Sequence, residues 1–460
     1  MDKPDEAPDR QEHGNWQPRR DPLVWAVFGV YFALAITYSY VMELGHGPDE
    51  SDRHYPYVQW LTQERTLPPA DPTVDCGALE LHPPLYYLSL VPVYAVAHRY
   101  GDRVALRTLR WTSPFLIFAA LLLWLAVIRR ACANRRYTGL FCLALTAWWP
   151  NLFVAAGSFN NDVGAMLCSA VLLYLVVVSD LGGPGARVEG VRGLWTSPLG
   201  SAAIAGAVIG LGALMKSSVL TVCVPVLAVA VARQHGRRFY RDGYFWLRGL
   251  MAAATCIAVC GWWYLRNLEL HGALVPIPQG YSLIPAHLTK LEALMGGLVG
   301  PVLLRAINGL WVSVFAGAVW FPEWTHPAVY WPLRALTAAG VIGVSIGLWR
   351  TCTARAVFAP GQATALVLSA AGFGAIYLAT VWVAVFVHFG VHQGGRYLLP
   401  FLPGLTIPLG LGLKQLVPAR LRAASAAALL AFLLALSFLA WYHMVTYWNP
   451  LVLEVSGPFG

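Results

Sequence analysis

Charged residues are scarce in this chain. Of its 460 residues only 12% are Asp, Glu, Lys or Arg, whereas 57% are hydrophobic. An ordinary soluble domain needs a polar surface that this composition cannot supply, so the composition excludes that class. Apolar runs of about 17 to 25 residues recur along the whole length, which is what a helix needs to cross a hydrocarbon core of about 30 Å. The sequence therefore predicts an all-α, polytopic membrane protein.

Several other signals are absent. Runs of alternating polarity, which mark transmembrane barrels, do not occur, so helices are the expected spanning elements. No Gly-rich phosphate loop precedes a helix, and no nucleotide-sugar site is apparent. We find no internal repeat, no low-complexity block, and no disulfide or zinc spacing among the eight cysteines. Only Cys76 falls in a polar loop, and Cys256 and Cys260 are interpreted as packing residues on one helix face.

Positive charge is in excess, with a formal net charge of +9, but Lys and Arg cluster at the ends of apolar segments. This positive-inside pattern orients membrane helices and argues against nucleic acid as a partner. Residues 1–20 are interpreted as a disordered cytoplasmic tail and not as a cleaved signal peptide, since they are polar and the following apolar run is too long. Residues 21–450 are predicted to form one transmembrane domain, followed by a short tail at 451–460.

The apolar runs give a set of expected spans, which continue to about residue 441. They are Pro22–Met42, Trp111–Ile128, Tyr137–Gly157, Val163–Ser179, Leu199–Met215, Val219–Ala232, Phe245–Leu265, Ala328–Trp349, Ala363–Val387, Tyr397–Leu413 and Leu421–Trp441. The short run Leu85–Ala97 must then not span fully, or another segment must be broken. A count of about 11 to 13 spans stays open at this stage.

The basic residues orient these spans. With Arg19-Arg20 before the first span, its start is cytoplasmic and Glu43 onward is external. Two large external segments follow, 44–84 and 267–326, both expected to carry interfacial helices. In the first, Tyr55–Leu61 is predicted to form an amphipathic helix anchored by aromatic side chains. The expected location is the plasma (inner) membrane.

Two adjacent acids, Asp49 and Glu50, follow the first span directly. A carboxylate pair at a membrane boundary costs solvation free energy and is a functional candidate for that reason. A partly shielded carboxylate has a raised pKa and can accept a proton from an attacking hydroxyl. Alternatively, the pair could hold a divalent cation together with His46 or His82. The alternative without function is a solvated acid that caps the following helix.

The segment His82-Pro83-Pro84 comes about thirty residues later. Paired prolines fix the backbone that enters the next helix, so His82 is presented at a set position. It can then hydrogen-bond a carboxylate or a phosphate oxygen. In the alternative interpretation, the prolines open a helix and the histidine is incidental.

The order of these motifs resembles two families of the GT-C glycosyltransferase fold, the protein O-mannosyltransferases and the bacterial aminoarabinose transferases that modify lipid A. The resemblance rests on the acidic pair after the first span and on His82-Pro83-Pro84-Leu85 after an external loop. Further segments agree in order, over about residues 20–410: Ser158–Asp162, Leu214–Lys216 with Pro225, Gly261–Asn267 and Gly394–Pro400. The chain departs from the aminoarabinose transferases, which carry Lys where His82 stands, and from relatives with large soluble domains.

The resemblance implies a sugar donor linked to a polyprenyl phosphate, with transfer to an acceptor hydroxyl on the outer face and inversion of the anomeric centre. By that analogy Asp49 or Glu50 is the general base, and the sequence does not decide between them. The acceptor is a glycolipid, a glycan or a protein. The residues expected to bind the sugar or the acceptor are His82, Tyr86, Asn161 and Asp162, although capping of the helix that starts at Asp162 is an alternative for that acid.

A lipid-phosphate donor leaves as a phosphate anion, whose developing charge needs fixed cationic donors. Arg396, Lys216 and Arg266, with Tyr397 beside the first, are expected at the outer ends of helices and are predicted to bind this phosphate. Arg396 is favoured, because Gly394-Gly395 permits a close backbone approach and Arg can grip phosphate with two parallel hydrogen bonds. The alternative for each cation is snorkelling to lipid headgroups.

Two other classes of function compete with this interpretation. A transporter or flippase for a lipid-linked sugar would need polar residues near mid-membrane and often shows paired half-repeats. A non-catalytic membrane protein of envelope assembly would leave Asp49 and Glu50 without chemistry. The sequence favours the glycosyltransferase, because its polar clusters lie at helix ends.

Overall fold

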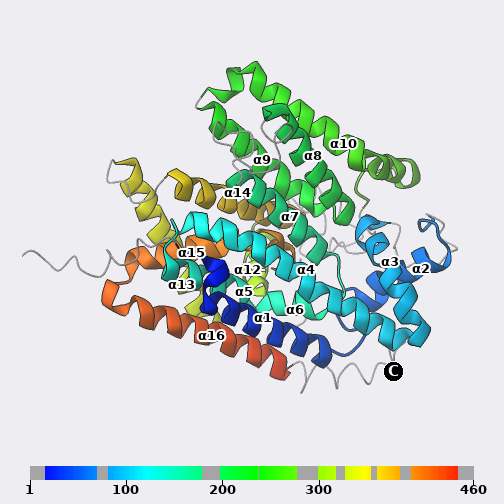
Figure 1. Cartoon of the computed structure of the whole chain (residues 1–460), viewed down its shortest axis with the longest axis horizontal. Coiled ribbons are helices and arrows are strands. Elements are labelled where there is room, and N and C mark those ends of the chain that lie inside the picture. Colours follow the sequence, from blue (N-terminus) through cyan, green and yellow to red (C-terminus); the bar gives the residue numbers. More distant parts are fainter. Residues whose placement is uncertain are drawn as a thin grey trace, which may run out of the picture.

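The computed structural model describes residues 16–69, 81–178, 197–236, 238–276, 299–316, 327–353, 360–383 and 395–443. In this part of the chain every regular element is a helix (Figure 1). The long helices are α1 (Pro22–Val41), α4 (Asp102–Ala131), α7 (Asp162–Val177), α8 (Pro198–Met215), α9 (Ser218–His235), α10 (Gly243–His271), α12 (Val299–Ala316), α13 (Pro327–Cys352), α14 (Pro360–Trp382) and α16 (Arg422–His443). The tails 1–15 and 444–460 and Cys76 lie outside the described residues, as do large parts of 267–326.

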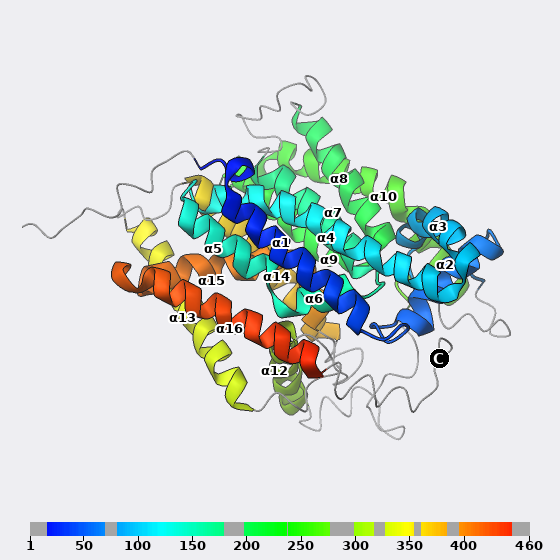
Figure 2. The ribbon, with the colours of Figure 1, turned by 60° about the horizontal axis from the view of Figure 1, so that its bottom comes forward.

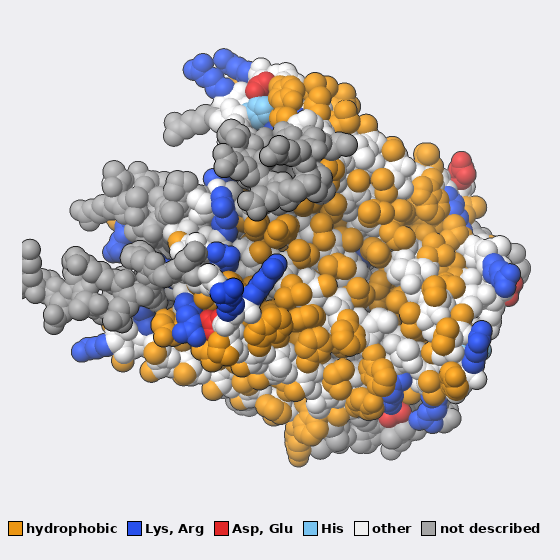
Figure 3. All heavy atoms as spheres, viewed as in Figure 1, with side chains coloured by type: hydrophobic (Ala, Val, Ile, Leu, Met, Phe, Trp, Pro, Cys, Tyr) orange, Lys and Arg blue, Asp and Glu red, His pale blue; other side chains and the backbone are white. Residues whose placement is uncertain are grey.

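The helices have the length and composition of membrane spans. Within the described residues seven helices are long and apolar enough to cross a bilayer, or nine if each of two bent pairs forms one span. Figure 3 shows hydrophobic side chains over the broad middle of one face, with Lys and Arg mainly toward its two ends. The expectation of an all-α, multi-pass membrane protein is confirmed, while the count of 11 to 13 spans stays a prediction.

Two expected spans are broken. The run Tyr137–Gly157 divides into α5 (Arg136–Ala147) and α6 (Pro150–Gly157), which meet at 50°. The run Tyr397–Leu413 divides into the 3-10 helix η8 (Gly395–Phe401) and α15 (Pro403–Leu416), which meet at 76°. In both cases a proline opens the second helix, because it has no N–H to continue the preceding hydrogen-bond ladder. Each of these two expected spans therefore consists of two helices that meet at a bend.

The segment 44–84, which was predicted to be external, packs onto the bundle in its described part. That part contains the single π turn η3 (Glu50–His54) and α2 (Tyr55–Gln63), and α3 (Leu85–Ala97) follows the segment. Figures 1 and 2 place α2 and α3 together at one end of the molecule, beside the end of α1. With 13 residues, α3 rises only about 20 Å and is too short to span. This short length agrees with one of the two alternatives that the sequence left open, a run Leu85–Ala97 that does not span fully.

The basic residues that were assigned to one side of the membrane gather at the other end. Arg136 pairs with Asp21 at the start of α1, with 2.6 Å between Nε and Oδ2. Lys414 at the end of α15 donates to Thr138 Oγ1 over 3.0 Å, and Arg233 at the end of α9 donates to Thr364 Oγ1 over 2.6 Å. These contacts join helix ends that the positive-inside pattern predicted to share one side.

Helices α8 and α10 run parallel in close contact, which brings the end of α8 to the same end as α2 and α3. A Cβ added at Gly206 would lie 2.2 Å from the Ala252 carbonyl oxygen, and one at Gly210 would lie 2.8 Å from Val259 Cβ. Small residues allow the two backbones to approach this closely. Such close van der Waals packing holds helices together in lipid, where the hydrophobic effect gives no driving force between them.

We expect Gly206→Ala to destabilise the fold by about 1–3 kcal/mol, because the new methyl group overlaps the backbone of α10. The matched control is Gly249→Ala on α10, where an added Cβ would meet no atom within 4 Å. The measurement is thermal unfolding of the purified protein in detergent. Equal unfolding temperatures for the two variants would contradict the close crossing.

Candidate active site

Glu50 is fully buried and all of its acceptor capacity is used. One carboxylate oxygen, Oε1, accepts from Arg110 Nε and from the Phe159 backbone N–H, both over 2.8 Å. The other, Oε2, accepts from a second nitrogen of Arg110 and from the backbone N–H groups of Gly45 and Gly47 over 3.0 and 3.2 Å. A carboxylate has about four lone-pair sites, so these five donors leave no site for a further proton.

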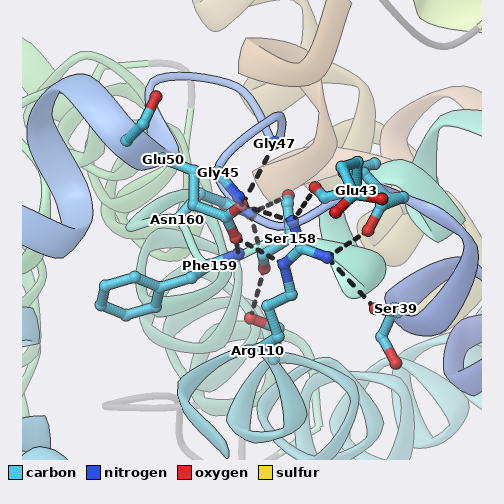
Figure 4. A network of polar contacts seen from close by, with 12 residues as sticks. Ser39, Glu43, Gly45, Gly47, Glu50, Arg110, Ser158, Phe159 and Asn160 are labelled. Atoms are coloured by element: carbon cyan, nitrogen blue, oxygen red, sulfur yellow. Dashed lines mark hydrogen bonds and ion pairs between the residues drawn. The ribbon is translucent and has the colours of Figure 1, made fainter. Parts of the chain in front are cut away.

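Arg110, from the first third of α4, is equally saturated (Figure 4). Besides Glu50 it donates to the backbone carbonyl oxygens of Ser39, Met42 and Glu43. All five N–H groups of the guanidinium are thereby used, and the side chain is fully buried. A buried ion pair is tolerated when its remaining donors and acceptors are satisfied in this way.

This ion pair joins two loops that lie far apart in the sequence. Glu50 belongs to the loop after α1, whereas Phe159 belongs to the loop before α7. The loops touch closely, since a Cβ on Gly47 would lie 2.7 Å from Ser158 Cβ. The two segments that carry the predicted acids, Asp49 and Asp162, are therefore held side by side.

Asp49 differs from Glu50 in its backbone conformation, its exposure and its ion-pair partner. Its backbone is left-handed, with φ of 58°, which turns its side chain away from the buried direction of Glu50. Its side chain is 33% exposed and forms an ion pair with Arg396. Burial opposes the charged form, but the charge of Arg396 and its hydrogen bond, together with His54 and Arg53, hold the pKa of Asp49 well below its usual value.

Arg396 connects Asp49 to a second acid, Asp162, and thereby to a second cation, Lys216. Its Nε lies 3.8 Å from Asp162 Oδ2, and the other oxygen of Asp162 pairs with Lys216 Nζ. The ring of Tyr397 lies beneath both cations, with Lys216 Nζ 4.6 Å and Arg396 Cζ 5.1 Å from its centroid. Two acids, two cations and one aromatic ring from four separate segments thus form one cluster.

Gly395 determines where Arg396 lies. Its backbone N–H donates to Ser313 Oγ over 2.8 Å, and an added Cβ would be 2.2 Å from the Val314 backbone nitrogen. The close backbone approach predicted at this glycine is therefore present, although its partner is α12. Gly394 lies outside the described residues.

Asp162 opens α7 and is enclosed, with 2% exposure. The turn is organised by Asn160, whose Oδ1 accepts from the Asp162 backbone N–H over 3.0 Å and whose Nδ2 donates to Ser158 Oγ over 2.9 Å. The carboxylate of Asp162 is thereby left to the two cations. Asn161 is buried and lies 3.5 Å from the Met215 carbonyl oxygen, so it holds the loop in place.

Two neutral histidines border the cluster. Burial, followed by the charges of Arg53 and Lys216, lowers the pKa of His82 to about 4. Burial also lowers the pKa of His54, whose Nδ1 lies 2.7 Å from Tyr87 Oη. The two imidazole centroids are 5.9 Å apart, so both rings present polar nitrogens without charge beside the acids.

The remaining predicted residues lie elsewhere. Tyr86 is 1% exposed and stacks on Phe159 with centroids 5.7 Å apart, which makes it part of the core. Arg266 donates to the Pro68 carbonyl oxygen over 2.5 Å and lies over the Trp263 ring. The structure thus brings Asp49, His82, Asp162, Lys216, Arg396 and Tyr397 together, and it places Arg266 at the loop after α2.

Sequence reasoning missed three residues of this site: Arg110, His54 and Tyr87. Arg110 had a usable signal, because it directly precedes the apolar run of α4 and ions at a membrane boundary are functional candidates. The sequence gives no signal that would pair His54 with Tyr87, since 33 positions separate them.

In the part of the chain that the structure describes, no group of three or more His, Cys, Asp or Glu side chains is arranged to hold a metal ion. Glu50, one of the predicted ligands with Asp49 and His82, is occupied by Arg110. A divalent cation at Asp49, Glu50 and His82 therefore stays a prediction.

No protein-family model matches this chain, and no curated protein matches it. Solved structures of ArnT from Cupriavidus metallidurans are similar to it, with 14% identity and a TM-score of 0.47 when bound to undecaprenyl phosphate, and 18% and 0.47 in the apo state. An oligosaccharyltransferase from Archaeoglobus fulgidus, tethered with an acceptor peptide, has 12% identity and a TM-score of 0.48.

The alignments cover 89%, 94% and 92% of this chain, but only 63%, 66% and 55% of the three solved chains. This chain thus spans less than two thirds of the length of the proteins that it matches. ArnT is an aminoarabinose transferase, one of the families that the sequence motifs resemble.

We expect Arg110→Gln to destabilise the protein by about 3–5 kcal/mol, because it leaves Glu50 buried without its counter-ion. The control is Arg103→Gln on the same helix, whose side chain is 66% exposed and lies 3.9 Å from Glu43. Loss of such a surface pair costs about 1 kcal/mol or less. Unfolding in detergent measures both, and equal losses would show that the buried pair does not hold the loops.

The low pKa of His82 predicts a stability that depends on pH. Unfolded histidine titrates near pH 6.5, whereas folded His82 titrates at about 4. Between these values the unfolded chain binds more protons, so stability falls as pH is lowered through this window. We expect His82→Gln to reduce the difference between the unfolding temperatures at about pH 7.5 and about pH 5.

The control for this measurement is His98→Gln, because the His98 side chain is 42% exposed. It should leave the pH dependence as in the wild type. An unchanged pH dependence in His82→Gln would mean that His82 takes up its proton in the folded protein as readily as in the unfolded chain.

Proposed function

We propose that this protein is a membrane glycosyltransferase that moves a sugar from a polyprenyl-phosphate donor to an acceptor hydroxyl on the extracytoplasmic side. The observation that supports this most is the cluster of Asp49, Asp162, Lys216 and Arg396 at one end of the helix bundle. It lies at the end opposite to the basic connectors, which the positive-inside rule assigns to the cytoplasm.

In this proposal Asp49 is the general base. Of the two adjacent acids it alone is partly exposed and has acceptor capacity to spare, since Glu50 accepts five hydrogen bonds. The acceptor oxygen attacks the anomeric carbon while its proton passes to Asp49, and the bond from that carbon to the phosphate oxygen breaks. A single displacement of this kind inverts the anomeric centre.

Arg396 and Lys216 stabilise the leaving group. The phosphate of the carrier lipid gains negative charge as the bond breaks, and fixed cations stabilise that charge without reorganising. The ring of Tyr397 and the enclosed carboxylate of Asp162 keep the two cations close together. Neutral His82, on the same side, is the residue that we propose for hydrogen bonding to the sugar or to the acceptor.

The rival transporter needs polar groups that line a path through the bilayer. The ion pairs of Asp49, Glu50 and Asp162 instead lie together at one end of the helices. The glycosyltransferase accounts for this arrangement, since a lipid-linked donor presents its phosphate at the membrane surface.

The test is transfer of a labelled sugar from a panel of polyprenyl-phosphate donors by purified protein in nanodiscs, with a cell-envelope extract as acceptor. We expect Asp49→Asn to lower the rate by about 10²–10⁴, the usual contribution of a general base. Arg396→Ala should lower it by about 10²–10³, as loss of a charge-stabilising donor does. A parallel series with a chelator addresses the divalent cation that the sequence also suggested.

Asp52→Asn is the control variant. Asp52 lies three positions from Asp49, is exposed, and accepts a hydrogen bond from the hydroxyl of Ser51 over 2.8 Å. It should transfer at the wild-type rate. Full transfer by both Asp49→Asn and Arg396→Ala would show that the assigned site is wrong.

A further inference from the structure

We infer that Arg396 changes partner when the donor binds: it releases Asp49 and takes the lipid phosphate, so that Asp49 becomes a free base only in the donor-bound protein. This inference rests on the proposed function and adds to it an order of events within the same site.

Asp49 and the entering lipid phosphate compete for the same side chain, Arg396. In the present structure its Nη2 donates to Asp49 and lies 3.3 Å from Tyr397 Oη, and its Nε faces Asp162. Its Nη1 is buried, with no hydrogen-bond partner among the described residues. An oxyanion can reach this enclosed N–H only if the guanidinium turns, and turning breaks the contact with Asp49.

The balance of charge also requires an exchange. Asp49 and Asp162 neutralise Arg396 and Lys216, so these four side chains offer an entering phosphate no surplus positive charge among them. One carboxylate must give up its cation, because three anions cannot share two cations in a half-buried site without repulsion.

Exposure decides which carboxylate is released. The Asp49 side chain is 33% exposed, so water can solvate its charge once Arg396 has turned away. Asp162 is 2% exposed and keeps Lys216, and an unpaired charge at that position would be costly. Glu50 is held by Arg110 and takes no part.

The exchange gives the base its reactivity. While it is paired with Arg396, Asp49 is a poor proton acceptor because its pKa is held low. Arg53, His54 and His82 also face Asp49 from η3 and from the start of α3, but both histidines are neutral. Removal of Arg396 therefore returns the pKa of Asp49 toward its ordinary value. Neither the acceptor nor water is activated before the donor is in place.

The test is binding of a polyprenyl monophosphate to wild-type protein, Asp49→Asn and Asp52→Asn in nanodiscs, with the uncharged polyprenyl alcohol as reference ligand. Asn fits the left-handed backbone at position 49, because Asn adopts this region more readily than most residues. We expect Asp49→Asn to bind the phosphate about tenfold more tightly or better, since its competitor for Arg396 has lost its charge.

Asp52→Asn should bind the phosphate within about twofold of wild type, since it removes a charge from the same segment but no partner of Arg396. The alcohol should bind all three proteins equally, which also shows that they are folded. In the double variant Asp49→Asn with Arg396→Ala the gain should disappear, because the two side chains act as one unit.

Two results would overturn the inference in distinguishable ways. Equal phosphate affinity of wild type and Asp49→Asn, with transfer lost in the variant, would refute the exchange and leave the proposed function standing. No binding of the phosphate by wild type, together with no sugar transfer by wild type from any donor of the panel, would refute the proposed function and the exchange together.

Discussion

The buried ion pair between Arg110 and Glu50 is the constraint on which the rest of the site depends. Removal of two charges from water costs several kcal/mol per ion, and the cost is offset only when the remaining donors and acceptors are satisfied. Here five donors converge on the carboxylate, and three backbone carbonyls in and just after the last turn of α1 accept from the guanidinium. A different arrangement of the loop after α1 would leave some of them unpaired, so the loop has one strongly preferred conformation.

Near this ion pair, three carboxylate side chains have different roles. Asp49, Glu50 and Asp162 are all carboxylates, but they differ in exposure, with 33%, 0% and 2% of the side chain accessible. The buried carboxylates of Glu50 and Asp162 hold loops and cations in place, whereas the partly exposed Asp49 can still accept a proton. In enzymes, neighbouring carboxyl groups are usually assigned as acid or base because their different environments separate their pKa values.

Much of the site was predictable because its signals are local. The acidic pair, Asp162, Lys216 and Arg396 were found as polar interruptions at the ends of apolar runs, and Gly395 as a point of close backbone approach. The bends at Pro150 and Pro403 were missed, although proline at the start of a helix is a signal for a break. Tyr86 and Arg266 were predicted from their position in motifs, which did not indicate the contacts of Tyr86 with Phe159 and of Arg266 with the Pro68 carbonyl.

The sequence by itself determined that this is a multi-pass helical membrane protein and which of its polar groups share one side. Hydropathy and the distribution of Lys and Arg act along the chain, so each run of about twenty residues carries its own information. Only the tertiary structure decided that Glu50 forms the buried ion pair with Arg110 and that Asp49 faces the cations. That decision depends on Arg110 and Arg396, which lie 60 and 347 positions away from their partners, and burial and ion pairing between such distant segments exist only once the chain has folded.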